Sequence, residues 1–91
     1  MKQRILVVED EKQIAKILKI ELDYEGYEVM VAYDGKSGLQ AALSEKLDLI
    51  LLDVMLPEIN GIEVLRRIRK ENNLIPVILL TARNMTIDKV A

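Results

Sequence analysis

The sequence contains no cysteine and no histidine. Without them the chain cannot build a disulfide framework, a zinc site of thiolate and imidazole ligands, a thiolate nucleophile, a Ser-His-Asp triad or a phosphohistidine. The missing cysteines fit a reducing compartment or indifference to redox state. Oxygen atoms of carboxylates, hydroxyls and backbone carbonyls are the metal ligands that remain.

Aromatic residues are also scarce, and there is no excess of positive charge. The chain has 13 Lys and Arg against 15 Asp and Glu, and three tyrosines are its only aromatic residues. A formal net charge of −2 gives no support for nucleic-acid binding by bulk electrostatics. The length of 91 residues, 51% of them hydrophobic, predicts one globular domain with a small core.

No long apolar run is present. The first one, Ile5 to Val8, is interrupted by Glu9. A signal peptide needs roughly 7–15 apolar residues and a membrane-spanning helix about 20. We therefore expect a cytoplasmic protein that does not contact a membrane.

Strand and helix patterns alternate along the chain. Short apolar runs predict strands over 5–8, 28–33, 49–52 and 77–80, and helical spacing of apolar residues predicts helices over 12–25, 36–45 and about 62–72. Asn60 is a plausible N-cap for the third helix. This alternation predicts an α/β fold with a parallel sheet and right-handed crossovers.

The last segment breaks off within a pattern. Residues 85–91 place Ile87, Val90 and Ala91 at apolar spacing, which predicts the start of another helix. No C-cap follows, and an uncapped, half-built amphipathic helix is marginal without tertiary packing. We therefore expect 1–91 to be one incomplete domain.

Acidic residues follow two of the predicted strands. Glu9 and Asp10 come directly after the first strand, and Asp53 comes after the third. If these two strands are neighbours, the three carboxylates converge at the carboxyl end of the sheet, where open α/β sheets bind ligands. Carboxylates held that close either have raised pKa values or share a cation, and oxygen ligands favour Mg²⁺.

The alternative interpretation is that each acid caps the following helix. Glu11 and Asp34 fit that interpretation individually, whereas two adjacent acids facing a third exceed what capping requires. Thr81 ends the fourth strand at the same edge, which makes its hydroxyl a candidate donor to a phosphoryl oxygen.

Three strings in this order carry a family resemblance: Val7-Val8-Glu9-Asp10-Glu11, Asp53-Val54-Met55-Leu56-Pro57 with Asn60-Gly61, and Thr81-Ala82-Arg83. Together they resemble the receiver domain of two-component response regulators. Thr81-Ala82-Arg83 followed by Ile87-Asp88-Lys89-Val90 is similar to the receivers of the winged-helix transcription-factor group. The resemblance implies a flavodoxin-like, doubly wound parallel sheet with strand order 2-1-3-4. It also implies that this chain lacks the family's fifth strand and fifth helix.

The resemblance further implies roles for the matched residues. Asp53 would accept a phosphoryl group from a partner sensor histidine kinase. Asp10, Asp53 and the backbone carbonyl of Met55 would ligate Mg²⁺, with Glu9 acting through a water molecule.

At the phosphoryl group, Thr81 would donate a hydrogen bond and the small Ala82 would leave room. The family's invariant lysine has no counterpart in these 91 residues, so phosphorylation is expected to be impaired.

Two other functions and one association stay open on the sequence. A Mg²⁺-dependent aspartyl-phosphate phosphatase of the haloacid-dehalogenase type requires Asp-x-Asp, and Met55 occupies the second position. The second alternative is a structural fragment or engineered piece of a flavodoxin-like fold without activity. An exposed fourth strand and an uncovered flank of the first helix predict self-association, and we expect no direct binding to nucleic acid.

Overall fold

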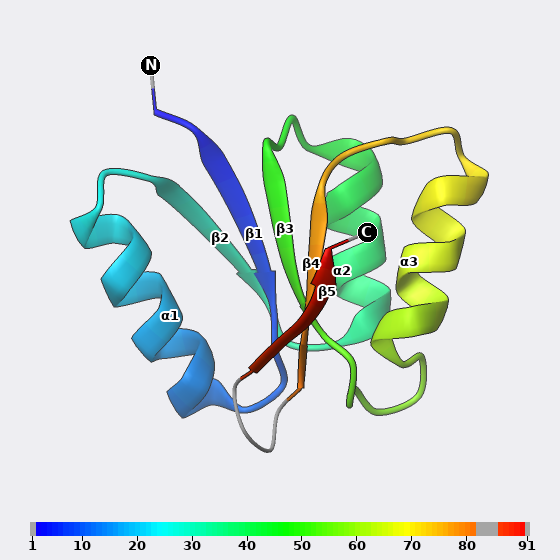
Figure 1. Ribbon diagram of the computed structural model, residues 1–91, viewed down its shortest axis with the longest axis horizontal. Coiled ribbons are helices and arrows are strands. Elements are labelled where there is room, and N and C mark those ends of the chain that lie inside the picture. Colours follow the sequence, from blue (N-terminus) through cyan, green and yellow to red (C-terminus); the bar gives the residue numbers. More distant parts are fainter. Residues whose placement is uncertain (1, 82–85, 91) are drawn as a thin grey trace.

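Strands and helices follow one another along the chain in the computed structural model, which describes residues 2–81 and 86–90, with residues 81 and 86–90 as backbone only (Figure 1). The elements are β1 (Arg4–Val8), α1 (Lys12–Tyr24), β2 (Glu28–Ala32), α2 (Gly35–Ser44), β3 (Leu49–Asp53), α3 (Gly61–Lys70), β4 (Val77–Thr81) and β5 (Thr86–Val90). The predicted strands and helices over residues 5–80 are all present, with ends that differ by a few residues.

The first four strands form a parallel sheet in the order β2-β1-β3-β4, which confirms the predicted order. In the register of this sheet, Val8 of β1 lies beside Leu52 of β3. The next residues of both strands are acidic, so the pairing of β1 with β3 determines where the site forms.

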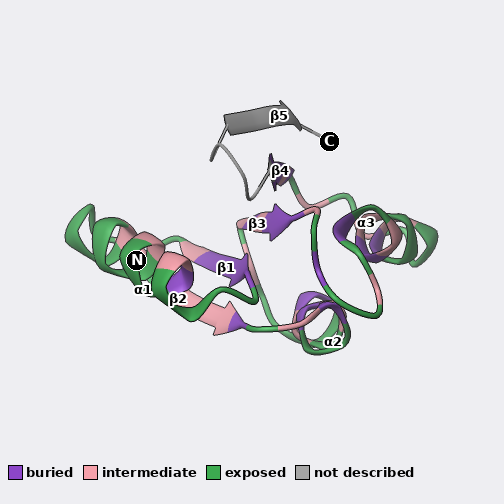
Figure 2. Cartoon of the chain, turned by 90° about the horizontal axis from the view of Figure 1, so that it is seen from below, coloured by how far each residue is buried: buried purple, intermediate pink, exposed green. Residues whose placement is uncertain are grey.

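Helices cover both faces of the sheet. α2 and α3 lie on one face, and α1 lies on the other against β1 and β2 (Figure 2). The core lies between the sheet and the α2–α3 layer. Its fully buried side chains include Leu6, Ile50, Leu52, Val64 and Ile68. Burying each such aliphatic side chain contributes about 1.5–3 kcal/mol, which makes this layer the main stabilising contact.

The helices begin where the sequence signals predict. Asp34 accepts a hydrogen bond from the Ser37 N–H at the start of α2, and Asn60 accepts one from the Glu63 N–H at the start of α3. The capping role predicted for Glu11 is wrong: Glu11 occupies the N-cap position of α1, but its side chain makes no capping hydrogen bond. Among the described residues, no helix has the length and apolar character needed to span a membrane.

The prediction of a helix at the end of the chain is wrong. Residues Thr86–Val90 form β5, which pairs antiparallel with β4 through a register shift between Leu79 and Leu80. The sheet therefore does have a fifth strand, although an antiparallel one. β4 would otherwise present unpaired N–H and C=O groups at the sheet edge, and pairing with the tail satisfies them.

The prediction of an exposed fourth strand is wrong for the same reason, because β5 pairs with it. The uncovered flank beside α1 is present: on that face of the sheet, a groove of about 450 Å³ extends from Leu22 of α1 to Ile78 of β4. Leu49 and Leu51 line its floor and are only partly buried. One face of the β3–β4 region is thus apolar and accessible.

Candidate functional site

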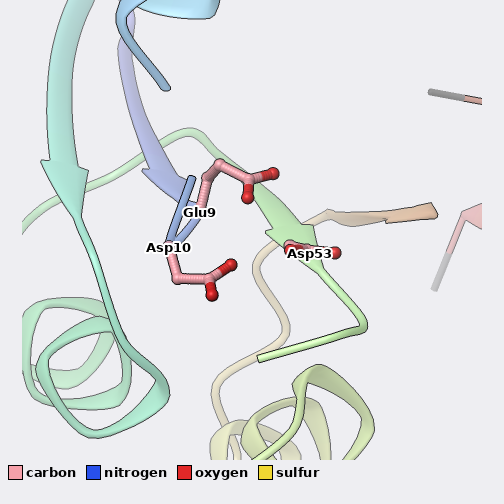
Figure 3. A group of neighbouring side chains, drawn as sticks. All are labelled: Glu9, Asp10 and Asp53. Atoms are coloured by element: carbon pink, nitrogen blue, oxygen red, sulfur yellow. The ribbon is translucent and has the colours of Figure 1, made fainter. Parts of the chain in front are cut away.

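The site lies at the carboxyl ends of β1 and β3, where Glu9, Asp10 and Asp53 meet (Figure 3). Asp53 is the last residue of β3, and Glu9 directly follows β1. One ligand oxygen from each carboxylate lies within 4.8 Å of the other two. The predicted convergence of these three residues is confirmed.

Two of the three carboxylates are buried. Glu9 is 1% exposed and Asp53 is 0% exposed, whereas Asp10 is exposed to solvent. The Glu11 N–H donates to Glu9 Oε2 at 3.0 Å, and the Met55 N–H donates to Asp53 Oδ1 at 3.0 Å. Within the described part of the chain, the second oxygens, Glu9 Oε1 and Asp53 Oδ2, are buried without a hydrogen-bond partner.

These surroundings disfavour the charged form of Glu9. Burial, together with the negative charges of Asp53 and Asp10, raises the pKa of Glu9 to about 7, against the lowering effect of the Glu11 N–H hydrogen bond. The protein thus holds a carboxyl group that is half protonated near neutral pH in the absence of a cation.

The side chains fit a hard divalent cation. A buried polar atom without a partner costs about 1–3 kcal/mol, more if it is charged, and a cation would satisfy both orphaned oxygens while neutralising the clustered carboxylates. The ion pairs found among the described residues do not involve Glu9, Asp10 or Asp53. No described Lys or Arg side chain therefore forms an ion pair with the cluster. A donor set composed of carboxylate oxygens suits Mg²⁺ better than a softer metal.

The loop between β3 and α3 forms the outer wall of the site. It includes Met55, whose side chain is 57% exposed, and a groove of about 500 Å³ opens between this loop and Asp10. The remaining lining residues are Val54, Leu56, Pro57, Asn60 and Ile62. The groove therefore connects solvent to Asp10, the exposed member of the cluster, along a mainly apolar wall.

Two further predicted site residues, Thr81 and Ala82, lie at or beyond the end of β4. The backbone of Thr81 ends β4 at the same edge of the sheet, next to β3, as predicted. Its side chain is not described, and Ala82 lies outside the described residues. Sequence reasoning missed a contribution of Gly61, to which it gave no role beyond its place in the Asn60-Gly61 string. Gly61 lies against the backbone of Asp53, a contact between residues eight positions apart that local patterns do not report.

Residues 5–91 match the model of the response regulator receiver domain family. The chain is 53% identical over 88 residues to response regulator ArlR of Staphylococcus saprophyticus, covering 97% of this chain and 40% of that protein. It is 55% identical over 89 residues to the uncharacterized transcriptional regulatory protein YkoG of Bacillus subtilis, covering 98% of this chain and 39% of that protein. The chain thus spans about 40% of the length of these curated relatives.

Solved receiver structures have the same fold. The response regulator TrrA of Thermotoga maritima in complex with Mg²⁺-BeF superposes with a TM-score of 0.85 at 45% identity, over 90% of this chain and 71% of that one. The receiver domain of the Francisella response regulator 1452 gives a TM-score of 0.86 at 36% identity, over 93% of this chain and 70% of that one. The chain belongs to the response regulator receiver domain family, the signalling module that its three sequence strings resemble.

Proposed function

We propose that Asp53 accepts a phosphoryl group from the phosphohistidine of a partner sensor kinase. The observation that supports this most strongly is the acidic cluster itself, with two buried carboxylate oxygens that lack a partner in the described structure. Asp10, Asp53 and the Met55 carbonyl would hold Mg²⁺, with Glu9 acting through a water molecule. The ion would screen the charge of carboxylate and phosphoryl oxygens when bound.

The two oxygens of Asp53 have different surroundings, and we therefore propose different roles for them. The Met55 N–H holds Oδ1 and orients the carboxylate. The unpartnered Oδ2 would attack phosphorus: an O–P bond forms, the P–N bond to the donor imidazole breaks, and the imidazole nitrogen keeps the electron pair. The Thr81 hydroxyl would donate to a phosphoryl oxygen, and Ala82 would leave space for it.

Solved relatives support both the cofactor and the partner. One structure of TrrA contains Mg²⁺-BeF, and another shows TrrA in complex with histidine kinase ThkA, at 46% identity and a TM-score of 0.82 over 88% of this chain. For this chain we propose a cytoplasmic, stoichiometric acceptor that transmits a signal and is not an enzyme. Any transcriptional output would require a partner or domain outside these 91 residues, which we propose do not bind nucleic acid themselves.

The rate of transfer is expected to be low when these 91 residues are tested on their own. The family's lysine supplies positive charge to the phosphoryl oxygens, and losing such a preorganised group costs on the order of 10²–10³ in rate. We therefore propose that binding of Mg²⁺ and of a phosphoryl mimic survives in this chain while transfer is slow.

Beryllofluoride separates binding from transfer, because it occupies a phosphoryl site without any bond being broken. Amide NMR spectra with Mg²⁺ and beryllofluoride should show a new set of signals for Asp53, Met55 and Thr81. An Asp53→Asn variant should show none. Unchanged wild-type spectra at saturating reagent would contradict the proposed site and leave the inactive structural fragment as the better description.

The phosphatase alternative makes a different prediction. Its family requires a second acid where this chain has Met55, and the family match places the chain among receivers. Steady release of inorganic phosphate from a small phosphodonor, continuing over many turnovers, would favour the phosphatase.

We also propose that the chain self-associates through the flank of α1 and not through β4. Ile17, Ile20 and Tyr24 of α1 are 60%, 56% and 87% exposed, and the apolar groove of the sheet lies on the same side of the molecule. Light scattering should show a mass that rises with concentration and that an Ile17→Glu/Ile20→Glu variant abolishes. A wild-type monomer throughout the micromolar range would contradict self-association.

A further inference from the structure

The loop from Val54 to Asn60 is short, and backbone hydrogen bonds join its beginning to the residue that follows its end. The Gly61 N–H and the Leu56 N–H both donate to the Val54 carbonyl, at 3.0 Å each. The Val54 N–H in turn donates to the Leu80 carbonyl at 3.0 Å, which extends the β3–β4 pairing one residue beyond Asp53. The backbone on either side of the Asp53 carboxylate is thus held by hydrogen bonds to fixed partners.

Gly61 allows the first turn of α3 to lie directly on this backbone. A Cβ atom at position 61 would overlap the Asp53 carbonyl oxygen and would lie 2.9 Å from Val54 Cα. These are backbone atoms within the sheet ladder, which cannot rotate away as the end of a flexible side chain could. Any residue larger than glycine must therefore displace either α3 or the backbone that carries Asp53 and Met55.

A second glycine holds the far end of the same loop. A Cβ atom at Gly35, the first residue of α2, would overlap the Ile59 carbonyl oxygen and would lie 3.1 Å from Val64 Cγ2. The loop is therefore enclosed between the starts of two helices. Of the two close approaches, only the one at Gly61 involves the residue that bears a site carboxylate.

We propose that Gly61 is a positioning residue for the cation site, acting through the backbone of Asp53 and Val54. This inference rests on the proposed function, because it assumes that the cluster of Glu9, Asp10 and Asp53 binds Mg²⁺. A methyl group at position 61 displaces the Asp53 carboxylate and the Met55 carbonyl relative to Asp10. Displacing groups that orient metal ligands lowers affinity by about 10- to 100-fold.

The test is a Mg²⁺ titration followed by the amide NMR signals of Glu9, Asp10 and Asp53, in the wild type and in Gly61→Ala. We expect the dissociation constant for Mg²⁺ to rise at least 10-fold in Gly61→Ala. The matched control is Val64→Ala, one turn further along α3, which removes buried volume without adding an atom beside Asp53. Val64→Ala should lower the thermal midpoint and change the Mg²⁺ dissociation constant less than 2-fold.

The outcomes separate this inference from the proposed function. A wild type that binds no Mg²⁺ refutes the proposed function. A wild type that binds Mg²⁺, with Gly61→Ala binding within 2-fold of it, refutes the positioning role alone, as does an equal loss in Val64→Ala. If Gly61→Ala is largely unfolded without metal, its folded fraction is followed by circular dichroism as Mg²⁺ is added, beside Val64→Ala: recovery at the same Mg²⁺ concentration as Val64→Ala overturns the inference, and recovery only at a 10-fold higher concentration or above supports it.

Discussion

Glu9 is the residue whose surroundings differ most from those of a solvated side chain. It is almost fully buried next to two other acids, and one of its oxygens lacks a partner in the described part of the chain. A buried carboxyl group of this kind is unfavourable for the fold when ionised and favourable for binding a cation. Under the proposed function, the residue therefore trades stability of the free domain for the ability to hold Mg²⁺.

This trade predicts how stability depends on pH. The folded-state pKa of Glu9, about 7, lies above its ordinary value of 4.5, so the native state binds more protons than the unfolded state between those limits. The contribution of Glu9 is fully present below pH 4.5 and is lost as the pH rises through about 7. The loss is about 3 kcal/mol, since one pKa unit corresponds to about 1.4 kcal/mol.

Urea unfolding without metal at pH 5 and pH 8 measures this loss. Glu9→Gln should remove most of the difference between the two pH values and be more stable than the wild type at pH 8. Glu11→Gln, an exposed neighbour in sequence, serves as the control and should retain the wild-type difference. An equal fall in stability for wild type and Glu9→Gln would show that other groups cause the pH dependence.

Glu58 is a second residue in an unfavourable state. In Glu9 the side chain carries the energetic cost, whereas in Glu58 the backbone conformation carries it. Its φ of +64° lies in the left-handed region, which costs a residue with a Cβ roughly 1–2 kcal/mol. Glu58→Gly removes that cost and loses part of the gain to the greater entropy of unfolded glycine. We expect a net stabilisation of about 0.5–1 kcal/mol by thermal or urea unfolding.

Asn72 provides the comparison for this prediction. Its φ is +59°, but asparagine adopts the left-handed region more readily than glutamate. Asn72→Gly should therefore gain less than Glu58→Gly. A destabilised Glu58→Gly variant would mean that the side chain of Glu58 contributes more to the loop than its backbone costs.

At the level of elements, α3 is the helix most closely tied to the site, and its start depends on one side chain. Asn60 accepts the Glu63 N–H at 3.0 Å and directly precedes Gly61. Glu63 also forms ion pairs with Arg66 at 3.0 Å and Arg67 at 2.9 Å, which lower its pKa. The first turn of α3 is thus held by a cap and by charge pairs on its exposed side.

Removing the cap should weaken the helix. Asn60→Ala is expected to cost about 1 kcal/mol of unfolding free energy, as measured by urea denaturation. Glu11→Ala, at the equivalent position of α1, should change stability by less than about 0.5 kcal/mol, because Glu11 makes no capping hydrogen bond. Equal effects of the two substitutions would indicate that capping does not determine the stability of α3.

At the level of the whole molecule, local patterns predicted most of the fold. The apolar run Ile5 to Val8, the stop after Asp53 and the cap at Asn60 are each encoded within a few residues. Their order along the chain implies the parallel sheet, and the sheet brings the acids together. The part of the site that depends on Glu9, Asp10 and Asp53 was therefore predictable before the structure was known.

What the sequence did not predict depends on contacts between distant residues. The i, i+3 spacing of Ile87 and Val90 is that of a helix and not the alternation of a half-buried strand. The segment nevertheless forms β5, because it pairs with the open edge of β4. The close approach of Gly61 to Asp53 arises only once α3 folds back on β3. In both cases a long-range backbone contact determines the outcome, and no local periodicity reports it.

The central claim, that Asp53 accepts a phosphoryl group with the help of Mg²⁺, is tested most directly by intact mass after incubation with a small phosphodonor such as phosphoramidate. The predicted result is a slow gain of one phosphoryl group in the wild type, which chelation of Mg²⁺ prevents and Asp53→Asn abolishes. Phosphorylation of Asp53→Asn to the same extent as the wild type would contradict the claim, as would a wild type that gains no mass after prolonged incubation with saturating donor and Mg²⁺.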